Sequence, residues 1–315
     1  MIAEILLILG AVVALDLVVG DPPSRLHPTA WIGRLIGAVT PKLKSRSANM
    51  EIIKGTVVAI TIISLVVVST YYFLHAIEEF LGVIALVIIS IVMLKSTIAI
   101  RGMENHARSV MNALANNDIA TAREKLSGIV GRDTSQLDEQ HILSATVESV
   151  GESTVDGIIS PIFYFALFGI PGAFAYRAIN TLDSMIGYKD AYHKNIGRFS
   201  AHLDTIANYI PARITAFLMV IAARIIGADW NNSLYVMNRD WHNTPSLNGG
   251  WPMATIAGAL RVRLEKIGYY SLGEDYEHLT LEHCERAISI MRVTALLFCL
   301  AFAAPAIILI LLFLW

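Results

Sequence analysis

Residues 131–156, GRDTSQLDEQHILSATVESVGESTVD, gather acidic and polar side chains in a chain that is otherwise largely apolar. Glu148 and Glu152 are four residues apart, so a helix through this stretch presents both carboxylates on one face, with Asp156 one turn further along. Like charges at this spacing repel each other, and more strongly where the dielectric is low. Because a cation relieves the repulsion, the pattern favours a site for Mg²⁺ or for a cationic substrate. The alternative is a solvated acidic helix face.

The residues before this helix are candidates for its start. Gly131 permits a tight turn, and Asp133 or Thr134 is a candidate N-cap, because a short side-chain oxygen accepts hydrogen bonds from the first free amides of a helix.

The composition indicates a polytopic all-α integral membrane protein. The 315 residues are 55% hydrophobic and 16% charged, with a mean hydropathy of +0.57. The net charge of −2 leaves no basic excess for nucleic acid as a partner. Cys284 and Cys299 have no CxxC spacing, so they indicate neither a disulfide scaffold nor zinc.

Three apolar runs near the N-terminus predict membrane helices. Residues 1–19 lack a cleavage site and predict a retained first span, in which Asp16 is either functional or placed at the interface. Residues 55–77 and 80–100 predict a helical hairpin that turns at an acidic tip, with Lys95 extending its ammonium to the interface.

A fourth apolar region predicts a broken or re-entrant span. Between residues 157 and 188, prolines and glycines interrupt the apolar run, and such breaks are tolerated where the backbone lines a cavity. The polar group that follows, around Asn180 and Asp183, is either a helix cap or part of a site. Residues 287–315 predict a last span, giving about four firm spans in one integral membrane domain, 1–315.

Two polar segments interrupt this domain. In the segment 101–157, apolar residues recur at helical spacing until NND at 116–118, which predicts two amphipathic helices. The segment 229–285 contains LNGGWPMATIAGAL, in which the Asn-Gly-Gly backbone either cradles a phosphate or forms a turn before a small-residue helix.

Basic residues indicate the orientation. The loop that follows the first span is rich in Lys and Arg, so residues 21–54 and 101–157 are expected on the cytoplasmic side of the cell membrane, with the tip at Glu78 and Glu79 outside. The chain has no GxxxxGK[ST], GxGxxG or HExxH motif, so a nucleotide must be held in another way.

Six polar blocks occur together and in order: GDPPSRLHPTAWIG, VGRDTSQLD, VESVGESTVDGIISPIFY, RAINTLDSMIGY, HLDTIANYIPAR and LNGGWPMATIAGALRVRL. Together they resemble the adenosylcobinamide-phosphate synthase family of cobalamin biosynthesis, the CobD/CbiB membrane proteins. The resemblance implies a ligase that uses ATP to join aminopropanol, or its phosphate, to a propionate carboxylate of adenosylcobyric acid. The sequence departs from the family pattern at four positions, Gly151, Ser153, Thr205 and Leu247.

Such a reaction needs Mg²⁺ ligands, cationic groups for moving phosphate charge, and a base. We expect Glu148, Glu152 and Asp133 as metal ligands or base, with Arg132 beside them as a catalytic residue. The expected substrate or nucleotide contacts are Asp21, His27, Asp156, Asn180, Asp183, Arg198, Asp204, Arg213 and Asn248.

The corrinoid needs a broad surface, for which Trp31 and Trp251 offer aromatic contacts. Other expected partners are the lipid bilayer, further enzymes of the corrinoid pathway and a second copy of the chain. Two rivals stay open: a transporter, which also uses broken spans, and a noncatalytic membrane scaffold.

Overall fold

The computed structural model describes residues 2–20 and 27–313. Asp21 lies outside the described residues. The chain divides into two compact units. The first unit comprises Met1–Ala99, Ser160–Asn208 and Ala303–Trp315, and the second comprises Ile100–Ile159 and Tyr209–Phe302. Both predicted polar segments therefore contribute to the second unit, and the prediction of one integral membrane domain stays a prediction.

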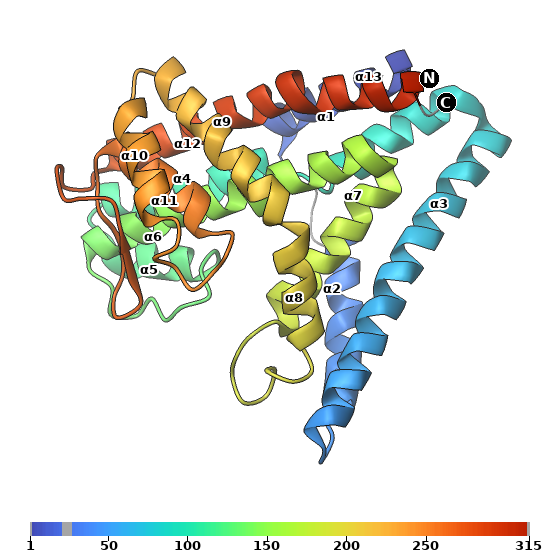
Figure 1. Cartoon of the computed structure of the whole chain (residues 1–315), viewed down its shortest axis with the longest axis horizontal. Helices are drawn as coiled ribbons and strands as arrows, with labels where there is room; N and C mark the ends of the chain where they lie inside the picture. Colours follow the sequence, from blue (N-terminus) through green and yellow to red (C-terminus); the bar gives the residue numbers. More distant parts are fainter. Residues whose placement is uncertain (1, 21–26, 314–315) are drawn as a thin grey trace. The chain divides into compact units, whose positions relative to one another are not determined.

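The first unit is helical (Figure 1). Its elements are α1 (Ile2–Val19), α2 (Pro28–Val39), the 3-10 helix η1 (Thr40–Leu43), α3 (Ala48–Lys95), α7 (Ser160–Ile186), α8 (Arg198–Ala207) and α13 (Ala304–Phe313). Apolar side chains from α2, α3 and α7, among them Ile36, Ile62 and Leu182, form a buried core. Close van der Waals packing of these side chains holds the three helices together.

The second unit contains the remaining helices and a short β-hairpin. Its helices are α4 (Ile100–Ala115), α5 (Ile119–Ser127), α6 (Glu139–Thr154), the π-helix η2 (Val155–Ile159), α9 (Tyr209–Ile225), α10 (Trp230–Asp240), α11 (Gly250–Leu260) and α12 (Leu281–Phe298), the last followed by the π-helix η3 (Cys299–Ala303). The strands are β1 (Leu264–Lys266) and β2 (Tyr270–Leu272). Helix α6 packs against α4, α11, α12 and β1, so it is central to this unit.

The described residues contain four helical stretches that are long and apolar enough to cross a membrane: Ile2–Val19, Ala48–Ala115, Glu139–Ile186 and Leu281–Phe313. The prediction of a polytopic all-α membrane protein is confirmed. The β-hairpin was not predicted.

Both predicted interruptions of apolar helices are present. Helix α3 changes direction in its cyan part (Figure 1), where Gly82 has φ 80°, a few residues beyond the predicted tip at Glu79. Helix α7 is broken at Gly169, with φ 68°, just before Pro171. A positive φ strains any residue with a Cβ, and proline removes a helical hydrogen bond, so this pair accounts for the break.

Asp16 and Lys95 form an ion pair inside the first unit. The Lys95 Nζ lies 2.9 Å from the Asp16 Oδ1, and both side chains are buried. The prediction that Lys95 extends to the interface is therefore wrong. Since a charge deep in an apolar environment needs an opposite partner, the pairing explains how α1 tolerates an acidic residue.

The two predicted amphipathic helices are confirmed as α4 and α5. Asn117 between them has φ 58°, and Asp118 accepts a hydrogen bond from the Thr121 amide as the N-cap of α5. The predicted cap of α6 is wrong: Asp138, not Asp133 or Thr134, accepts from the His141 amide. This hydrogen bond fixes the start of the helix that carries Glu148 and Glu152.

Gly151 on α6 has room for a methyl group. An added Cβ would lie 3.5 Å from the Ile256 Cδ1 and 3.6 Å from Met253, which are ordinary contact distances. Because glycine inside a helix is less favourable than alanine by about 0.5–1 kcal/mol, Gly151→Ala is expected to raise the free energy of unfolding by up to that amount without lowering activity. Denaturant unfolding in detergent micelles measures it. A clear loss of stability would contradict this packing.

Candidate active site

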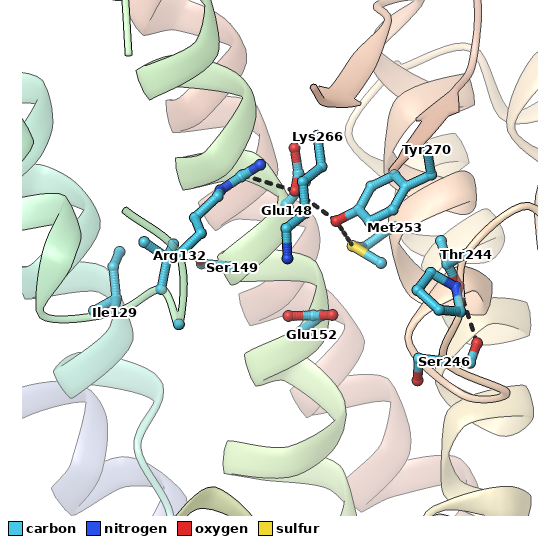
Figure 2. A pocket seen from close by; sticks show the side chains of 13 residues that line it. Ile129, Arg132, Glu148, Ser149, Glu152, Thr244, Ser246, Met253, Lys266 and Tyr270 are labelled. Atoms are coloured by element: carbon cyan, nitrogen blue, oxygen red, sulfur yellow. Dashed lines mark hydrogen bonds and ion pairs between the residues drawn. The ribbon is translucent and has the colours of Figure 1, made fainter. Parts of the chain in front are cut away.

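A cavity of about 230 Å³ lies within the second unit. The loop before α6, one face of α6, the loop before α11 and the β-hairpin converge on it (Figure 2). Its lining consists of charged, hydroxyl and small apolar residues: Ile129, Val130, Gly131, Arg132, Glu148, Ser149, Glu152, Thr244, Pro245, Ser246, Met253, Lys266 and Tyr270. Three residues of the predicted catalytic set, Arg132, Glu148 and Glu152, thus meet in one cavity.

Glu148 is held by three donors. Its Oε2 accepts from the Arg132 Nη2 at 2.9 Å and from the Tyr270 hydroxyl at 2.8 Å, and its Oε1 accepts from the Ser144 hydroxyl at 2.7 Å. The side chain is only 4% exposed. A buried carboxylate with this set of donors is fixed in place, so Glu148 positions Arg132 and Tyr270 at the cavity wall.

Tyr270 stays a donor in this network. Burial, followed by the negative charge of Glu148 and the hydrogen bond to it, raises the pKa of the Tyr270 phenol. Since all three causes disfavour the phenolate, the hydroxyl remains protonated at physiological pH.

Glu152 lies one helical turn beyond Glu148 and is exposed to the cavity (Figure 2). No hydrogen bond or ion pair joins it to the rest of the described chain. A Cβ added at Gly249 would come within 2.9 Å of the Glu152 Oε1, so a residue larger than glycine would crowd the carboxylate. Of the two predicted carboxylates, Glu152 is therefore the one whose oxygens are available to a ligand.

Lys266 brings a second cation to the cavity from the end of β1. Within the described ranges, no carboxylate oxygen lies within 4.0 Å of its Nζ. The ammonium lies 5.0 Å from the centre of the Tyr269 ring, and its charge also acts on the Glu152 carboxylate, with which it forms no ion pair. The cavity thus combines an unpaired carboxylate, an unpaired ammonium and the Arg132–Glu148 pair.

The loop before α11 forms a turn rather than an open phosphate cradle. The Ser246 hydroxyl accepts from the amides of Asn248 and Gly249, at 3.3 Å and 3.0 Å. A Cβ at Gly250 would lie 1.9 Å from the Trp241 carbonyl oxygen, so only glycine fits there. The turn interpretation of this sequence is confirmed, because two amides that a phosphate would need are already satisfied.

Arg213 is held beside the same loop. Its guanidinium lies 3.5 Å from the Tyr209 ring centre and 5.0 Å from that of Trp251, and its Nη1 donates to the Asn248 Oδ1 at 3.3 Å. Trp251 in turn stacks on Trp241. This stacking preorganises the guanidinium, which fits an anion-binding role, although neither Arg213 nor Asn248 lines the cavity.

Two predicted acidic residues of the second unit do not line the cavity. Asp133 accepts from the Ser135 amide at 2.9 Å, and this bond lowers its pKa. Asp156 is half-buried in η2. Their roles as metal ligand and substrate contact stay predictions.

The other described candidates belong to the first unit. Asp204 on α8 accepts from the side-chain amides of Asn180, at 3.4 Å, and Asn208, at 3.1 Å. The remaining three are His27 at the start of α2, half-buried Asp183 on α7, and exposed Arg198 at the start of α8. The structure thus gathers Asn180 and Asp204 into one hydrogen-bonded group, whose function stays a prediction.

Among the described residues, no group of three or more His, Cys, Asp or Glu side chains is placed to hold a metal ion. Mg²⁺ commonly binds through one or two carboxylates together with waters and substrate phosphates, so it does not need such a group. Glu152 fits this mode, whereas the oxygens of Glu148 already accept from three donors.

Sequence reasoning missed Lys266, Tyr270 and Ser144. The signal for Lys266 and Tyr270 was the pattern Leu264-x-Lys266, Gly268, Tyr270-x-Leu272, which is typical of two short strands around a glycine turn. Ser144 lies on α6 and had no such signal. In a chain predicted to be all-α, strands of three residues are too short to be recognised from the sequence pattern.

The fold and the cavity define a multi-pass α-helical membrane protein with a small site that contains both positively and negatively charged side chains. The chain belongs to the CobD/Cbib protein family, whose model matches residues 8–300. It is 41% identical over 301 residues to a probable cobalamin biosynthesis protein CobD of Methanothermobacter thermautotrophicus, covering 96% of this chain and 97% of that one.

A cobalamin biosynthesis protein CobD of Dehalococcoides mccartyi is 38% identical over 276 residues, 88% of this chain and 89% of that one. A probable CobD of Thermoplasma acidophilum is 36% identical over 301 residues, 96% and 97% of the two chains. No solved structure matches significantly.

Proposed function

We propose that this protein acts in cobalamin biosynthesis as an ATP-dependent ligase. It joins 1-amino-2-propanol, or its O-phosphate, to the propionate carboxylate of adenosylcobyric acid and gives adenosylcobinamide or its phosphate. One observation carries the proposal: in a CobD/Cbib family protein, an available carboxylate, Glu152, shares a small cavity with Arg132 and Lys266. Amide formation from a carboxylate, ATP and an amine requires these charges together.

The reaction takes two balanced steps. A carboxylate oxygen of the corrinoid attacks the γ-phosphorus of ATP, ADP leaves, and an acyl phosphate forms. The amine nitrogen then attacks the carbonyl carbon, inorganic phosphate leaves, and the nitrogen loses a proton to give the amide.

The cavity residues supply the charges that these steps need. Arg132, oriented by Glu148, and Lys266 stabilise negative charge on phosphate oxygens. Glu152 binds a cationic group or accepts the proton from the amine. If Mg²⁺ binds here, Glu152 would hold it with substrate phosphates and water, and the ion would screen phosphate charge.

An isotope experiment tests this chemistry. With ¹⁸O in the propionate carboxylate of adenosylcobyric acid, one label is expected in the released inorganic phosphate, because the carboxylate oxygen bonds to phosphorus before it leaves. Amide product with unlabelled phosphate would rule out the acyl phosphate.

A transporter remains the alternative, since broken helices such as α7 also occur at transport sites. Sealed vesicles distinguish the two: a transporter accumulates labelled corrinoid inside without forming an amide, whereas a ligase forms the amide with or without a sealed membrane. A scaffold does neither.

We propose that the polar segments face the cytoplasm. A membrane-impermeant thiol reagent added to intact cells should label Glu79→Cys and not Ser135→Cys, because the basic loops stay inside. Both should react after permeabilisation. Background labelling should be low, because Cys284 and Cys299 are buried. Labelling of Ser135→Cys in intact cells would reverse the orientation.

We also propose that aromatic residues contact the corrinoid. Trp31 on α2 is 52% exposed, whereas Trp251 is partly covered by Trp241 and Arg213. Trp31→Ala is thus the cleaner probe, and unchanged corrinoid affinity in that variant would remove it from the binding surface.

A further inference from the structure

The β-hairpin presents Lys266 and Tyr270 on the same face. Strands β1 and β2 are antiparallel, and these two residues are direct partners in the register. Directly opposed residues in an antiparallel pair project to one side of the hairpin. Accordingly, both side chains line the cavity, where Tyr270 faces Glu148 (Figure 2).

The hairpin is anchored to α6, so Lys266 has a defined position. The Glu265 amide donates to the Ser144 hydroxyl at 2.8 Å, and that hydroxyl donates to Glu148. Leu264 and Leu272, partners in the register, are fully buried on the same face of the hairpin, two residues along each strand from Lys266 and Tyr270. A turn with Gly268 at φ 75° closes the two strands.

The two cationic side chains of the cavity, Arg132 and Lys266, differ in how available their charges are to a ligand. The guanidinium of Arg132 is paired with Glu148 through its Nη2, as described above, so its charge is partly compensated. Lys266 has no such partner among the described residues and stays half-buried. A cation at a cavity wall that lacks a carboxylate partner attracts the anionic group of a ligand.

The size of the cavity limits that group. Pockets that enclose a drug-sized ligand span about 300–1,000 Å³, whereas this one has about 230 Å³. It therefore accommodates one small charged group, such as a phosphate with a short chain, rather than a whole nucleotide or corrinoid.

We propose that Lys266 is the specificity-determining residue of this cavity and contacts a phosphate group of the substrate. This inference rests on the proposed ligase function. The phosphate belongs either to the amine substrate or to ATP, and the two sources make different kinetic predictions.

Steady-state kinetics of Lys266→Met tests the proposal, because methionine keeps the length of the side chain and removes its charge. Loss of a hydrogen bond to a charged group raises KM by roughly 10- to 100-fold. If the amine supplies the phosphate, KM rises for aminopropanol phosphate and not for aminopropanol or ATP. If ATP supplies it, KM rises for ATP alone. Either result supports the contact with phosphate.

Two variants serve as controls. Lys266→Arg keeps the positive charge and should restore most of the affinity for the phosphate-bearing substrate that Lys266→Met loses. If Lys266 had only a structural role, this recovery would not depend on the charge. Lys125→Met, at an exposed position on α5 of the same unit, should leave every KM unchanged. An active Lys266→Met protein with wild-type KM values, or with only kcat reduced, would overturn the proposal.

A measurement on the wild-type protein does not depend on the variant folding. Acetic anhydride should acetylate Lys266. Relative to exposed Lys125 in the same sample, aminopropanol phosphate or ATP should protect Lys266, whereas aminopropanol, whose amine consumes as much reagent, should not. Equal acetylation in all conditions would overturn the contact. An inactive wild-type protein would instead count against the proposed ligase, so the two failures are distinguishable.

Discussion

Glu152→Gln is expected to lower turnover by about 10²–10³, because an electrostatic contact made at the reacting groups contributes roughly 3–4 kcal/mol to transition-state stabilisation. The substitution removes one charge with almost no change of shape. Since Glu152 accepts no hydrogen bond from the described residues, the fold should persist and stability should change little. The Mg²⁺ concentration that gives half-maximal turnover should rise if Glu152 holds the ion.

Glu139→Gln is the matched control, since it makes the same change at an exposed position in the first turn of α6. Its turnover and Mg²⁺ dependence should equal those of the wild type. A Glu152→Gln protein with wild-type turnover would instead support the solvated-face interpretation of the acidic pair.

Glu148→Leu is expected to lower the free energy of unfolding by about 3–5 kcal/mol, the usual effect of removing one partner from a buried ion pair. The substitution leaves the Arg132 guanidinium, 14% exposed, without its carboxylate, and it takes the acceptor away from Tyr270 and Ser144. Unfolding in mixed detergent micelles, followed by tryptophan fluorescence, measures the change.

A double-mutant cycle isolates the pair. Arg132→Met with Glu148→Leu should recover part of the stability lost in Glu148→Leu, because no buried charge is then left alone. Arg261→Met provides a surface comparison in the same unit: its pair with Asp229 is more exposed, so the expected change is within about 1 kcal/mol. Strict additivity of the Arg132 and Glu148 substitutions would show that the pair contributes nothing.

Local patterns in the sequence predicted much of the helical structure. NND at 116–118 and the Gly169–Pro171 pair mark real breaks, because positive φ and a missing amide act within a few residues. Helical spacing likewise placed Glu148 and Glu152 on one face of α6.

Contacts between distant segments were beyond such reasoning. Asp16 and Lys95 are far apart in the chain, so the sequence around neither residue predicts the ion pair that they form. The same holds for Tyr270 and Glu148. Only tertiary packing shows that the two carboxylates of α6 differ, one enclosed by donors and one open to the cavity.

The proposed ligase activity is tested by incubating the purified protein with adenosylcobyric acid, ATP, Mg²⁺ and either aminopropanol or its phosphate, followed by mass spectrometry of the corrinoid. We expect the corrinoid to gain the mass of the amine less one water, in step with formation of ADP and inorganic phosphate. An unchanged corrinoid mass with every amine, from protein shown to be folded, would contradict the proposed ligase.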